Sequence, residues 1–61
     1  MKTIKPKFAV EIWQHSHQPV TIGVRAVNAQ AAERAAKRIG LADRRVLRGV
    51  KICQIIVRPA F

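Results

Sequence analysis

Apolar and polar residues alternate along two neighbouring stretches of the chain. From Lys7 to Gln14, one side carries Phe8, Val10 and Ile12, and the other side carries Ala9, Glu11 and Trp13. Residues 20–27 repeat the pattern, with Val20, Ile22, Val24 and Ala26 sharing one side. A period of two is typical of half-buried strands. Because a short polar segment, His15 to Pro19, separates the two runs, we expect a hairpin.

The period changes to that of a helix after Asn28. An asparagine there is a good N-cap, and Gly40 stands where a left-handed residue commonly ends a helix, which predicts a helix of about eleven residues. At 100° per residue, four alanines and Ile39 share one 120° arc, and the opposite side is polar and basic. An apolar face made almost entirely of alanine should lie close against a sheet.

A third strand is expected over residues 50–58, and both of its sides are largely apolar. One helix covers only one face of a sheet, so we expect the other face to gather apolar side chains. We assign to this predicted protein interface Trp13, Val27, Ile55 and Val57. A chain of 61 residues also buries a small core, and a second molecule on this face would add to it. The sequence therefore predicts a homo-oligomer.

Together these elements predict a small α+β fold in the order β-β-α-β, formed by a single basic domain over residues 1–61. A right-handed crossover through the helix should place the third strand parallel to the second, with the first strand between them. The expected architecture is a three-stranded β-sheet with one helix on one face.

Positive charge is concentrated in the second half of the chain. The formal net charge is +9, and seven of the twelve Lys and Arg residues lie between positions 34 and 51, namely Arg34, Lys37, Arg38, Arg44, Arg45, Arg48 and Lys51. Arginine offers two parallel donors to phosphate oxygens, and lysine a mobile point charge. We therefore expect this helix face and the following loop to bind the phosphate backbone of nucleic acid. A solvated face that serves solubility alone, and an acidic protein partner, remain alternatives.

Candidate chemistry is sparse, and we expect no enzymatic activity, no cofactor and no metal site. His15 and His17 are alternate residues of the expected hairpin loop, and sequence places no third ligand beside them. Cys53, the single cysteine, falls inside an apolar strand, where a thiol behaves as a small hydrophobic group. The three acidic residues are scattered and form no carboxylate pair.

Compartment signals favour a soluble, cytoplasmic protein with no membrane partner. A lone cysteine fits a reducing setting, Glu11 interrupts the N-terminal apolar run, and no other run approaches the roughly 20 residues of a membrane span.

Residues 22–39, IGVRAVNAQAAERAAKRI, run from a strand through a polar cap into an alanine-rich helix. This segment resembles the middle of several very small phage-encoded proteins, some anti-CRISPR proteins among them. The resemblance implies a stoichiometric inhibitor or adaptor that binds a host protein or nucleoprotein complex, which is the alternative to a nucleic-acid-binding module. The high positive charge departs from the acidic members of that group that mimic DNA.

Overall fold

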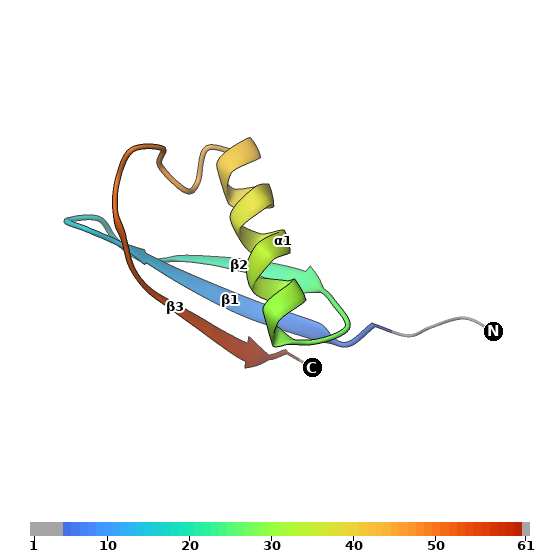
Figure 1. Cartoon of the computed structure of the whole chain (residues 1–61). Coiled ribbons are helices and arrows are strands. Elements are labelled where there is room, and N and C mark those ends of the chain that lie inside the picture. The colour runs from blue at the N-terminus through green and yellow to red at the C-terminus, as the bar shows by residue number, and fades with distance from the viewer. Residues whose placement is uncertain (1–4, 61) are drawn as a thin grey trace.

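A computed structural model describes residues 5–60 and contains one helix and one sheet (Figure 1). The elements are β1 (Lys7–Gln14), β2 (Val20–Arg25), α1 (Ala29–Ala42) and β3 (Ile52–Pro59). The α+β class and the β-β-α-β order are as the sequence predicts.

The sheet has the order β2-β1-β3, and β1 pairs antiparallel with both neighbours. Consequently β2 and β3 run parallel to each other on either side of β1, as predicted. In the hairpin, Val10 lies opposite Ile22 and Ile12 opposite Val20. Directly opposed residues share a face, so this register gathers the apolar side chains of both strands on the side that faces α1.

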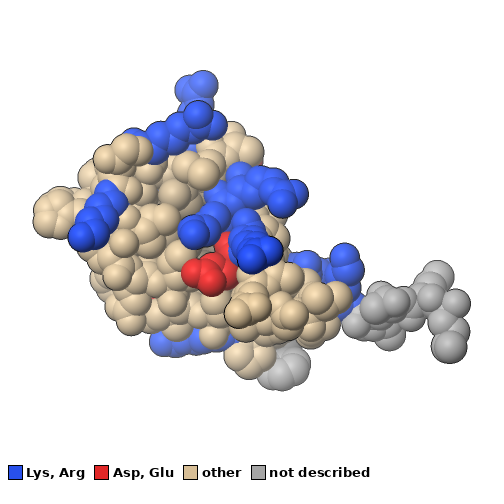
Figure 2. All heavy atoms as spheres, viewed as in Figure 1, with Lys and Arg blue, Asp and Glu red and all other residues tan. Residues whose placement is uncertain are grey.

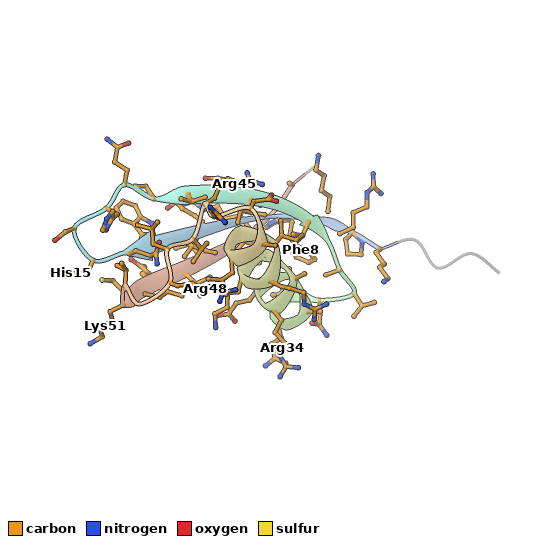
Figure 3. All side chains as sticks on the ribbon, turned by 90° about the horizontal axis from the view of Figure 1, so that it is seen from above. Phe8, His15, Arg34, Arg45, Arg48 and Lys51 are labelled. Carbon is orange, nitrogen blue, oxygen red and sulfur yellow. The ribbon has the colours of Figure 1, made fainter. Side chains whose placement is uncertain are left out.

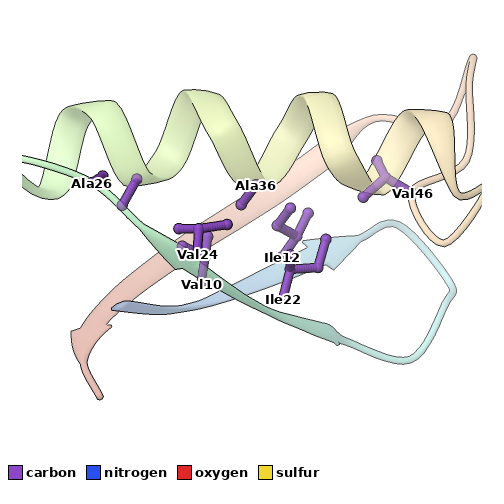
Figure 4. Close-up of a cluster of buried hydrophobic side chains, with 8 residues drawn as sticks. Val10, Ile12, Ile22, Val24, Ala26, Ala36 and Val46 are labelled. Atoms are coloured by element: carbon purple, nitrogen blue, oxygen red, sulfur yellow. The ribbon is translucent and has the colours of Figure 1, made fainter. Parts of the chain in front are cut away.

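The core lies between this face of the sheet and α1 (Figure 4). Val10, Ile12 and Ile22 are its largest fully buried side chains, and Ala32 and Ala36 meet them from the helix. Alanine at these positions lets the helix backbone approach the sheet closely, because its side chain ends at the methyl group. Asn28 caps the helix as expected, since its Oδ1 accepts a hydrogen bond from the backbone N–H of Ala31 at 2.8 Å.

Gly40 does not end the helix, which corrects the prediction. α1 continues to Ala42, and Gly40 is buried inside it. A Cβ at this position would lie 2.8 Å from Cδ1 of Ile22 and would also collide with the side chain of Val46. Glycine is therefore required here for close packing. The buried face of α1 accordingly runs through Ala32, Ala36 and Gly40, and it leaves Ile39 38% exposed.

The third strand contains a bulge that interrupts its alternation. Gln14 pairs with Ile52 and Trp13 with Gln54, so Cys53 is an extra residue between them. Beyond the bulge, Ile55 lies opposite Ile12 and Val57 opposite Val10. Ile52, Ile55 and Val57 all pack against the core, because the bulge shifts the alternation of the strand between Ile52 and Ile55.

Candidate nucleic-acid interface

The seven basic residues of the candidate interface lie on two successive segments. Arg34, Lys37 and Arg38 belong to α1, and the other four belong to the connection between α1 and β3. Lys37 is half-buried along the side of the helix, and the remaining six are exposed. Figure 2 shows blue side chains gathered over α1 and along the connection, with a single small acidic patch among them.

These residues do not cluster near one end of the molecule. Seen from above, Arg45 and Arg34 lie on opposite sides of α1 (Figure 3). Lys51 lies beside the β1–β2 hairpin loop, because the backbone N–H of His15 donates to its carbonyl oxygen at 3.0 Å. The basic surface is thus a broad band along the helix side of the molecule.

Arg44 forms the turn that ends α1. The N–H of Arg45 donates to the carbonyl of Gly40 at 2.9 Å, and the N–H of Arg44 donates to that of Leu41 at 3.3 Å. This pair of bonds is the Schellman motif, in which the residue after the cap is left-handed. Here that residue is Arg44, with φ of 60°. Arg44 therefore adopts the left-handed backbone conformation, which glycine adopts without steric cost and other residues do not.

Gln14 holds the second half of the connection. It is the one buried polar side chain of residues 5–60. Its Nε2 donates to the carbonyl of Leu47 at 2.8 Å and to that of Val50 at 3.3 Å, and its Oε1 accepts from the N–H of Leu47 at 3.0 Å. These bonds bracket Arg48 and fix the backbone that carries it. Sequence reasoning assigned Gln14 only to the polar end of a strand.

Few negative charges neutralise the basic band. Arg45 donates to Oδ2 of Asp43 at 3.0 Å, and both side chains are about half exposed. A surface pair of this kind contributes roughly 0–1 kcal/mol. It is the one ion pair formed among residues 5–60, so the other six basic side chains have no acidic partner there.

The four residues of the predicted protein interface do not share one surface. Ile55 and Val57 are half-buried against the core on the helix side of the sheet. Trp13 lies on the opposite, open face and is 39% exposed, and Val27 follows β2 and is 60% exposed. Alternation within β3 could not identify its inward side because both sides are apolar, and pairing with β1 decides it.

The two histidines of the hairpin loop and Cys53 are all exposed. His15 and His17 are exposed, and Nδ1 of His17 lies 2.7 Å from the carbonyl oxygen of His15. Within residues 5–60, no group of three side chains is placed to bind a metal ion. Cys53 is exposed at the bulge, so its predicted role as a small buried hydrophobic group is wrong.

No protein-family model, curated protein or solved structure matches this chain. The likeness of residues 22–39 to small phage-encoded proteins therefore stays a prediction. Over the described part of the chain, no helix has both the length and the apolar composition needed to cross a membrane.

Proposed function

We propose that this protein is a non-catalytic module that binds the phosphate backbone of nucleic acid through the basic band of α1 and the connection that follows it. The observation that carries the proposal is that six arginine and lysine side chains of the band are exposed and that Arg45 alone among them pairs with an acidic residue, Asp43, within residues 5–60. The whole chain has a net charge of +9. Unneutralised arginines on a fixed backbone suit phosphate contacts, which position a protein without reading bases.

Backbone fixation supports the same function. The hydrogen bonds of Gln14 hold the segment around Arg48, and the Schellman motif holds Arg44 and Arg45. A preorganised donor loses less conformational entropy when it binds phosphate. An arginine at the left-handed position 44 is also consistent with a functional use of its charge, since strained residues gather at functional sites.

Salt dependence of binding to duplex DNA tests the proposal. Each neutralised phosphate contributes a slope of about −0.9 in log K against log salt, so four contacts would weaken binding roughly a hundredfold between 50 and 200 mM. Arg38→Gln should reduce the slope by about one unit and weaken binding to unrelated sequences equally.

The matched control is Lys5→Gln, which removes the same charge at an exposed position before β1, outside the basic band. It should leave the slope for duplex DNA nearly unchanged. Equal slopes for both variants and the parent protein would refute the interface, and so would a lack of binding at 50 mM salt.

The alternative function is that of a small inhibitor or adaptor that binds a host protein or nucleoprotein. The exposed apolar side chains of Trp13 and Val27 favour it, because buried aromatic anchors dominate protein interfaces. This function predicts weak binding to free DNA at physiological salt, and a larger loss of target binding from Trp13→Ala than from Arg38→Gln.

A further inference from the structure

The face of the sheet that points away from α1 is covered by no other element of residues 5–60. Alternation and pairing with β1 place on it three basic residues, one acidic residue and two large apolar residues, namely Lys7, Arg25, Arg58, Glu11, Trp13 and Ile56. The basic side chains are exposed, whereas Glu11 and Ile56 are half-buried. The face is therefore open, carries more basic than acidic residues, and holds the single tryptophan of the chain.

The indole of Trp13 is held in one orientation. Its Nε1 donates a hydrogen bond of 2.6 Å to Oε1 of Glu11, two residues earlier on the same face. Trp13 as a residue is 39% exposed despite this bond. A ring that is already oriented loses little freedom when a flat ligand stacks on it, and a nucleic acid base is such a ligand.

Two cations face each other at the other end of this surface. Lys7 lies directly opposite Arg25 on the neighbouring strand. Like charges in this position destabilise a sheet unless an anion separates them. Arg58 lies opposite Ala9, two residues along β1 from Lys7, and brings a third positive charge to the same region. Three neighbouring cations at this end of the face suit an anion of more than one charge.

The spacing along β1 suits a short run of nucleotides. At roughly 3.3 Å per residue, Trp13 is about 13 Å from the row of Arg58 and about 20 Å from the row of Lys7. Between them, the row of Glu11 carries Thr21 and Ile56, and the Glu11 carboxylate is bonded to Trp13, whereas the row of Arg58 holds only the small residues Ala9 and Gly23 beside it. A strand of about four nucleotides spans such a distance.

We infer that this open face binds single-stranded nucleic acid, with one base stacked on Trp13 and the following phosphates held by Arg58, Lys7 and Arg25. A second copy of the chain fits the face less well, because it would bring the same three cations toward a molecule of charge +9. The site is separate from the proposed basic band, and its ligand has accessible bases, which duplex DNA lacks.

Tryptophan fluorescence provides the test, because the chain has one tryptophan and no tyrosine. Titration of the full chain with the hexanucleotide dT6 at low salt should quench the emission of Trp13. Measured by anisotropy of labelled dT6, Trp13→Ala should weaken binding about tenfold or more, and Trp13→Phe should weaken it less. Arg58→Gln should weaken it with quenching retained, and the circular dichroism spectra should show that all variants are folded.

Lys5→Gln is the matched control, since it removes one exposed charge outside both proposed surfaces and should change dT6 binding little. If the protein does not bind duplex DNA but dT6 still quenches the emission of Trp13, the open-face site is supported and only the basic band is refuted. Absence of quenching, or equal binding of dT6 by the parent protein and Trp13→Ala, overturns the inference. So does a dimer in sedimentation that Trp13→Ala dissociates while dT6 binding stays unchanged.

Discussion

The side-chain amide of Gln14, at the end of β1, pairs with both backbone polar groups of Leu47, 33 residues further along the chain. This amide replaces the sheet partner that the connection between α1 and β3 lacks. Because the same Nε2 also reaches the carbonyl of Val50, one buried side chain determines the path of the backbone that carries Arg48. The hairpin and the basic connection are thereby coupled.

Replacing Gln14 with Leu should destabilise the protein by about 1–3 kcal/mol, although leucine has a similar volume. The change leaves the N–H and carbonyl of Leu47 without their partner, and a buried polar group without a hydrogen bond costs about that much. Urea unfolding measures the loss. Amide exchange at Leu47 should also become faster, and unchanged exchange there would contradict the role of Gln14.

Gly40→Ala should destabilise the protein by about 1–3 kcal/mol, although alanine favours helix by about 1 kcal/mol. The added methyl group would collide with Val46 and Ile22. The control is Gly23→Ala, where a Cβ would meet only Cε of Lys7, at an ordinary 3.7 Å. Thermal unfolding of both variants decides the matter, and a stabilised Gly40→Ala protein would show that the helix is not packed as described.

Replacing both His15 and His17 with Ala should change the free energy of unfolding by less than about 0.5 kcal/mol, because both side chains are exposed. Phosphate binding should also persist. Elemental analysis of the purified protein provides the second measurement. A stoichiometric metal that disappears in the double variant would reveal a site at this loop.

Local periodicity was sufficient to predict much of this fold. β1 matches its predicted bounds, and the even-numbered residues of β1 and β2 form the sheet side of the core, because alternation and burial coincide in a hairpin with one covered face. Asn28 is a local signal too, since its cap involves only the first turn of α1.

Long-range contacts explain what the sequence left undetermined. Gly40 is compatible both with a helix end and with close packing, and only the position of Val46 distinguishes them. From the sequence alone, Gln14 is only a polar residue at the end of a strand. Its role depends on Leu47, a partner from a distant segment. The exposed, basic character of the candidate interface was predictable from composition, whereas its spread over a broad band depends on where the connection turns.

Arg44 offers a test that separates stability from binding. Arg44→Gly should stabilise the protein by about 0.5–1 kcal/mol, because glycine adopts the left-handed conformation without the steric cost that other residues carry. Arg44→Gln is the matched control, since it removes the charge and keeps that cost. In titrations with duplex DNA at several salt concentrations, both variants should reduce the slope of log K against log salt by the same amount, about one unit if Arg44 contacts a phosphate.

In urea unfolding, only Arg44→Gly should gain stability. If Arg44→Gly is instead less stable than Arg44→Gln, the conformation at residue 44 is not the source of strain; if neither variant changes the slope, Arg44 does not belong to the phosphate-binding surface.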